Sequence, residues 1–145
     1  KLNLLSGYWG AILVYAALGT PFSTFLMTSY FRGLPDDLVE ASVIDGLSFP
    51  KIFLRIGLPL AVPAIVTVIV LQFIQVWDDL LVGLLFIQEP TYRTITVGLG
   101  ALAAGRVIDI PVLLAGSLVS AIPAIVVYLI FQRQLVSGLT AGIGK

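Results

Sequence analysis

The chain has 145 residues, of which 59% are hydrophobic and 11% charged, and its mean hydropathy is +1.07. These values indicate a membrane protein rather than a water-soluble domain. The eight basic and eight acidic residues balance, so no basic surface points to nucleic acid, and the absence of Cys and His excludes thiol nucleophiles, disulfides, zinc sites and imidazole acid–base chemistry.

Three long apolar runs predict membrane-spanning helices. A bilayer core about 30 Å thick needs about 20 apolar residues in a helix. The apolar runs cover residues 8–31, 56–78 and 110–132. The first run continues with no small-residue cleavage pattern, so it predicts a spanning helix rather than a signal peptide. The fold class predicted from these runs is an all-α membrane protein with three transmembrane helices, because the core of a soluble protein rarely contains three such runs in so short a chain.

The segment between the first two runs, residues 33–55, predicts a helix, a glycine turn and a second helix. Asp36 and Asp37 follow a proline and favour the start of a helix, because negative charge suits the positive end of the helix dipole. Gly46 is a natural stop that can adopt a left-handed conformation, and Ser48 is a candidate N-cap for the next helix. The unit is suited to docking a partner; the alternative is an ordinary amphipathic loop on the membrane surface.

The distribution of basic residues predicts the orientation of the chain. One side of the membrane would hold Arg32, Lys51, Arg55, Arg133 and Lys145, and the other side would hold Lys1, Arg93 and Arg106. Because loops with more Lys and Arg stay in the cytoplasm, this distribution predicts that residues 33–55 and the C-terminus are cytoplasmic.

Polar residues lie on one side of the second predicted span. Gln72, Gln75 and Asp79 fall within about 60° of each other at 100° per residue. Polar side chains at membrane depth usually face the interior of a helix bundle or an aqueous path. One interpretation is a solute pathway, with Trp77 as a stacking surface for a sugar. The other is that the glutamines bind neighbouring helices and the aspartates lie at the outer interface.

Prolines and the remaining connections complete the predicted layout. Pro21 predicts a kink within the first span, whereas Pro59 and Pro63 fall in the first turns of the second span, where a missing N–H is tolerated and a bend costs little. The apolar run after Asp79 predicts that the helix continues or is followed by a short one. Residues 88–109 predict an external loop with a short helical piece. Asp109 or Ile110 is expected near the cap of the third span.

One spaced signature in the cytoplasmic segment resembles a known family. Residues 40–46 read EASVIDG, and nine residues later residues 56–59 read IGLP. This pattern resembles the EAA signature of the inner-membrane permease subunits of ABC importers, which is E-A-A, three residues, G, nine residues, I-x-L-P. Ser42, where Ala is usual, is the one departure. Residues 77–80 and 136–142 are similar to stretches of the carbohydrate branch, the maltose-transporter-like permeases.

The resemblance implies a role for the whole chain. It would be the C-terminal part of a six-helix permease domain in the cell's inner membrane, and residues 33–55 would be the segment that couples it to an ATPase. The implied coupling residues are Glu40, Ala41, Ser42, Asp45, Gly46, Ile56, Leu58 and Pro59. The implied partners are two ATP-binding cassette ATPase subunits that bind ATP and Mg, a second permease subunit and an extracytoplasmic solute-binding protein. The cargo would be a carbohydrate.

Two other function classes are weighed against this one. A non-ABC channel or a secondary transporter would be expected to carry charges deep in the spans or inverted repeats, and neither is evident. A membrane enzyme would need a catalytic site, and the sequence offers no catalytic residues, no metal ligands and no G-x-x-x-x-G-K-[ST] loop for ATP. The chain is therefore predicted to be a transport subunit that binds no cofactor of its own.

Overall fold

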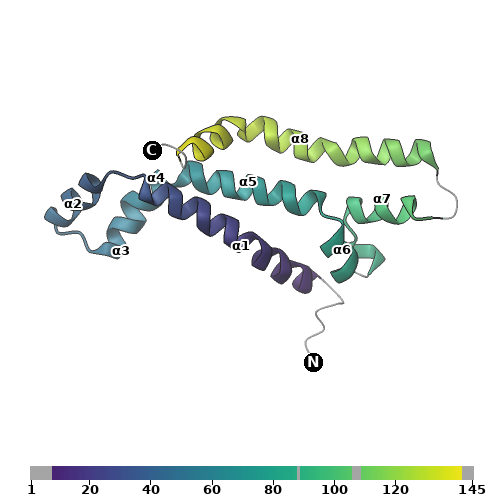
Figure 1. Ribbon diagram of the computed structural model, residues 1–145, viewed down its shortest axis with the longest axis horizontal. Coiled ribbons are helices and arrows are strands. Elements are labelled where there is room, and N and C mark those ends of the chain that lie inside the picture. Colours follow the sequence, from purple (N-terminus) through teal and green to yellow (C-terminus); the bar gives the residue numbers. More distant parts are fainter. Residues whose placement is uncertain (1–7, 88, 106–108, 142–145) are drawn as a thin grey trace, which may run out of the picture. The chain divides into compact units, whose positions relative to one another are not determined.

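The computed structural model describes residues 8–87, 89–105 and 109–141, and the elements in these ranges are helical (Figure 1). In chain order they are α1 (Tyr8–Arg32), α2 (Asp36–Ile44), α3 (Phe49–Ile52), the π-helical turn η1 (Phe53–Gly57), α4 (Leu58–Leu60), α5 (Val62–Asp78), α6 (Leu81–Phe86), the 3-10 turn η2 (Pro90–Tyr92), α7 (Ile95–Ala103) and α8 (Ile110–Ala141). The predicted all-α fold class is confirmed. Lys1, Arg106 and Lys145, which enter the charge distribution above, lie outside the described residues, and the orientation stays a prediction.

Two of the described helices are long and apolar enough to cross a bilayer by themselves. They are α1, with 25 residues, and the part of α8 from Ile110 to Val136, with 27 residues. A third candidate span is a pair of helical segments, Phe49–Leu60 and Val62–Asp78, which meet at an angle of 65°. The described chain therefore has two to three candidate spans.

The bend lies at Ala61, between Pro59 and Pro63. Pro63 has no N–H to donate to the carbonyl of Pro59, so one i→i−4 hydrogen bond is missing where the helix turns. Ala61 itself is fully buried and has a ψ of −4°. The bend falls within the predicted second span, residues 56–78, so that residues 56–60 precede it and residues 62–78 follow it.

The chain divides into two compact units. One comprises residues 1–20 and 71–129, and the other comprises residues 21–70 and 130–145. In the first, the buried residues Ala11, Val82 and Ile87 form an apolar cluster against the N-terminal half of α1. In the second, the buried apolar residues are Leu26, Ile52, Ala61, Ala64, Val70 and Leu135. Most large apolar side chains of α8 are exposed, as expected of a helix that meets lipid or further membrane helices.

Candidate functional site

The predicted helix–glycine–helix segment is present between α1 and α5. The first helix, α2, begins at Asp36 and ends at Ile44. Gly46 follows with a φ of 75°, the left-handed conformation that glycine adopts at least cost. Ser48 occupies the N-cap position of α3, where its carbonyl accepts the backbone N–H of Lys51 at 2.8 Å and of Ile52 at 3.0 Å, while its hydroxyl makes no cap hydrogen bond.

One face of α2 packs inward and the other is open to solvent. Ser42, the buried residue of this helix, is 4% exposed, and its hydroxyl donates to the carbonyl of Leu38 at 2.5 Å. Glu40, Ala41 and Asp45 are all exposed. Ile44 is 85% exposed, which is the highest value among the exposed large apolar side chains of this helix. The helix therefore presents an apolar residue beside carboxylates.

The arm from Phe49 to Leu60 packs against the end of α1. The hydroxyl of Tyr30 donates to the carbonyl of Leu60, and the rings of Phe31 and Phe53 lie 6.1 Å apart. A cavity of about 230 Å³ lies between these elements and α2; its lining is mostly apolar and includes Phe31, Leu34, Leu38, Phe49, Ile52, Phe53, Ile56 and Leu60. Among the predicted coupling residues, Ile56 lines this cavity, while Leu58 and Pro59 are exposed.

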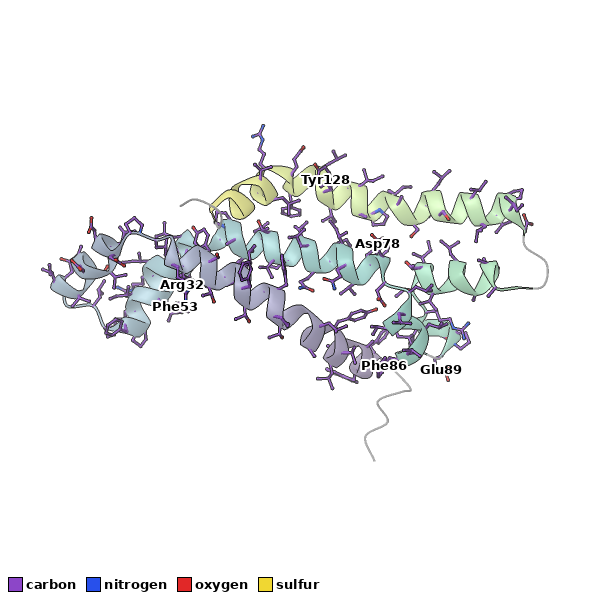
Figure 2. The ribbon with its side chains drawn as sticks, viewed as in Figure 1. Arg32, Phe53, Asp78, Phe86, Glu89 and Tyr128 are labelled. Carbon is purple, nitrogen blue, oxygen red and sulfur yellow. The ribbon has the colours of Figure 1, made fainter. Side chains whose placement is uncertain are left out.

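The three polar residues predicted to share one side, Gln72, Gln75 and Asp79, do not act as one group. The amide nitrogen Nε2 of Gln72 donates to the carbonyl of Gly19 at 3.3 Å. Asp79 follows Asp78, the last residue of α5 (Figure 2), and its Oδ2 accepts the hydroxyl of Tyr15 at 3.0 Å. Gln75, by contrast, is exposed. Gln72 and Asp79 therefore both hydrogen-bond to α1, whereas Gln75 is exposed.

Asp79 also holds the start of α6. Its Oδ2 accepts the backbone N–H groups of Val82 at 2.7 Å and Gly83 at 3.3 Å, which would otherwise have no partner at the beginning of a helix. One carboxylate oxygen therefore joins the end of α5, the start of α6 and α1. Tyr15 was missed in the sequence; the available signal was a phenol within an otherwise apolar run, since a buried Tyr hydroxyl usually has a partner.

Trp77 is part of the same helix junction. Its indole N–H donates to the carbonyl of Ser120 at 2.9 Å, and its own carbonyl accepts the hydroxyl of Thr96 at 2.9 Å. Its ring stacks with Phe73 at 5.8 Å between centroids. These contacts favour the packing interpretation of Trp77 over the sugar-stacking one. Thr96 was not singled out in the sequence because small hydroxyl residues are common in membrane helices.

Comparison with known proteins agrees with the signature. Residues 1–140 match the family described as the inner membrane component of binding-protein-dependent transport systems. The chain belongs to this family. In this transport-system component the signature begins in α2, continues through α3 and η1, and ends in α4. The resemblance to ABC permeases drawn from the sequence is confirmed.

Curated relatives of this inner membrane component are similar over nearly all of the chain. It is 40% identical over 144 residues to the trehalose/maltose transport system permease protein MalG of Thermococcus litoralis, covering 98% of the chain and 51% of the relative. It is 36% identical over 141 residues to the sulfoquinovosyl glycerol transport system permease protein SmoH of Agrobacterium fabrum, covering 97% and 50%. It is 33% identical over 144 residues to the diacetylchitobiose uptake system permease protein NgcG of Streptomyces coelicolor, covering 98% and 48%. The chain spans about half the length of these relatives.

The serine that departs from the family signature gives a first prediction. Ser42→Ala removes only the hydroxyl that donates to the carbonyl of Leu38 within the same helix. Because a hydrogen bond of this local kind contributes little to the stability of a helix, we expect uptake within about twofold of wild type. Ser42→Leu places a large side chain at a site that is 4% exposed, and we expect it to displace α2 and abolish uptake. Solute uptake by cells at matched membrane levels measures both. Equal uptake by the two variants would contradict this packing of α2.

The carboxylate of Asp79 gives a second prediction. Asp79→Ala leaves the hydroxyl of Tyr15 and two backbone N–H groups of α6 without their acceptor, and we expect the free energy of unfolding to fall by about 1–3 kcal/mol. Thermal unfolding of the purified protein in detergent measures the change. Asp78→Ala is the matched control, because that neighbouring side chain is exposed, and it should change stability little. A loss of stability as large in the control would contradict the role of Asp79.

Proposed function

We propose that this chain belongs to the permease subunit of an ATP-driven ABC importer that carries a carbohydrate. The family match supports a transport subunit of the inner membrane. The three relatives named above are described by sugars or sugar derivatives: trehalose and maltose, sulfoquinovosyl glycerol, and diacetylchitobiose. The chain itself performs no covalent chemistry; solute crosses the membrane as helices change between inward-facing and outward-facing arrangements.

The coupling step of this proposal places α2 and Gly46 against a partner ATPase. Two such subunits would bind ATP and Mg and draw together, and the docked helix would follow. The observation that carries this assignment is the exposed pair Glu40 and Ile44 on a short helix within the signature. Transmission requires a connector that does not absorb the motion. The hydrogen bond from Tyr30 to Leu60 and the contact between Phe31 and Phe53 supply such a connection to α1.

The remaining parts of the proposal concern orientation, partners and the solute pathway. The coupling segment and the C-terminus would be cytoplasmic, with a second permease subunit alongside and a solute-binding protein on the other face. Among Gln72, Gln75 and Asp79, Gln75 is the better candidate for solute contact because it is exposed. Gln72 and Asp79 already hydrogen-bond to α1, which favours a packing role for both.

Co-purification tests the proposal. The affinity-tagged full-length protein, extracted from its own cells in mild detergent, is expected to retain an ATPase subunit. Ile44→Asp should remove that subunit, because a charge replaces an apolar side chain that is 85% exposed and so costs the fold little. Thr91→Asp is the control: Thr91 is also exposed but lies in η2, away from the signature. The proposal fails if no ATPase accompanies the wild-type protein, or if Ile44→Asp retains it in full.

A further inference from the structure

The arm from Phe49 to Leu60 is steeply inclined to α5, the helix that follows it. It meets the segment Val62–Asp78 at 65°. Transmembrane helices are tilted from the bilayer normal by about 20° on average, so a segment bent this far from one lies nearer to the plane of the membrane than to its normal. The arm therefore has the inclination of an interfacial helix.

The contacts of the arm with α1 place it at the depth where that helix ends. Tyr30 and Phe31, which contact Leu60 and Phe53, belong to the last turn of α1. The helix then ends at Arg32, which is labelled with Phe53 in Figure 2. Aromatic residues and a basic residue at the end of an apolar helix are typical of the boundary between membrane and water. The arm is thereby held at that boundary.

The arm has two faces of different character. Phe49, Ile52, Phe53 and Ile56 follow the spacing i, i+3, i+4, i+7 and line the cavity beside α1 and α2. Lys51, Leu54, Arg55 and Leu58 follow the same spacing on another side, which we term the basic–leucine face, and all four are exposed. Leu54 is 60% exposed and Ile52 only 7%, but Phe49 on the cavity-lining side is itself 74% exposed, so the two sides differ in charge more than in exposure.

The two basic residues of the basic–leucine face have no acidic residue near them in the sequence. Between Asp45 and Asp78 the sequence contains Lys51 and Arg55 and no acidic residue. Two cations beside exposed leucines, on a helix at membrane depth, match the pattern of helices that insert apolar side chains at the acyl boundary and hold anionic headgroups with basic ones.

We propose that the basic–leucine face binds the anionic phospholipids of the membrane surface, with Leu54 and Leu58 at the acyl boundary and Lys51 and Arg55 at lipid phosphates. This interaction goes beyond the proposed transport function, and its test needs neither an ATPase nor a solute. An acidic surface of a partner protein is the competing occupant, and the experiment distinguishes the two.

The test uses a fluorescent probe on the full-length protein in lipid nanodiscs. This chain contains no Cys, so once any Cys elsewhere in the full-length protein is replaced by Ser, a single Cys at Leu54 can be labelled with bimane. The matched control is a single Cys at Ile44, which is also exposed but lies on α2. Nanodiscs contain phosphatidylcholine alone or with phosphatidylglycerol, each with a lipid carrying a nitroxide near its headgroup. We expect the nitroxide to quench the probe at Leu54 at least about threefold more than the probe at Ile44, and more strongly with phosphatidylglycerol.

Charge removal completes the test. Adding Lys51→Gln and Arg55→Gln should abolish the gain from phosphatidylglycerol while preserving the circular dichroism of the protein, since both side chains are exposed. Equal quenching at Leu54 and Ile44 would overturn the proposal, as would a gain from phosphatidylglycerol that survives both substitutions. In the transporter assembled with its partners, protection of the Leu54 probe from both the nitroxide lipid and aqueous iodide would show that a protein covers this face, and would also overturn it.

Discussion

Glu40→Lys is expected to abolish solute uptake while the protein remains in the membrane at its normal level. Glu40 is exposed on α2, so replacing it costs the fold little, and the effect should fall on the docked partner. Reversing a charge within an interface either places like charges together or breaks a charge pair. Either change reduces the binding free energy by about 2–5 kcal/mol. A loss of that size weakens the affinity of the permease for the ATPase by more than about tenfold. Uptake of labelled solute and immunoblots of membrane fractions measure the two expected results.

The matched control for Glu40 is Asp37→Lys. It changes the charge of the same helix by the same amount, and Asp37 is likewise exposed, but it lies outside the signature. We expect it to retain most of the uptake. Normal uptake by Glu40→Lys with the natural partner ATPase would contradict the coupling role of α2, whereas loss with both variants would assign the effect to the charge of the helix as a whole.

Gly138→Ala is expected to give the largest loss of stability of any single methyl added to the described helices. A Cβ at this position of α8 would overlap the hydroxyl of Thr67 on α5 and lie 2.9 Å from its Cβ. Thr67 cannot yield readily, because it is fully buried and its hydroxyl lies 2.9 Å from the carbonyls of both Pro63 and Gln134. Overpacking of this kind costs about 1–3 kcal/mol, and we expect the unfolding midpoint in detergent to fall accordingly.

Gly98→Ala is the matched control for this substitution. Gly98 lies within α7, and no atom lies within 4 Å of the position its Cβ would take. Alanine is the better helix former, so this variant should be as stable as wild type or up to about 1 kcal/mol more stable. If Gly138→Ala and Gly98→Ala unfold at the same midpoint, the close approach of α8 to Thr67 does not exist in the protein.

Local features of the fold were predicted well because their causes are local. Asp36 marks the start of α2, and Gly46 has the left-handed conformation. Asp109 lies just before α8, where its side chain accepts the backbone N–H of Val112 at 3.2 Å. Each of these depends on the backbone chemistry of one residue and its near neighbours, so a single sequence is sufficient.

The long-range contacts of the candidate site could not be predicted in the same way. The helical wheel placed Gln72, Gln75 and Asp79 on one side, but it did not say which helix would lie there. Tyr15, the partner of Asp79, is 64 residues away in the chain. The buried pair of Thr67 and Gly138 is equally remote, and neither residue is unusual in an apolar run. Such pairings follow from how the helices pack, which one sequence does not specify.

The winding of η1 bears on how the signature is recognised in other permeases. A π-helical turn closes its hydrogen bonds over one residue more than an α-helical turn, and the residues 53–57 that form it lie between the signature glycine and the bend. A homologue with one residue fewer in this interval would form an uninterrupted α-helix, and its signature proline would lie on the same side of that helix as Pro59 does here. A search that requires nine residues between the signature glycine and the I-x-L-P stretch would overlook such a homologue, although its helix would be arranged as in this chain.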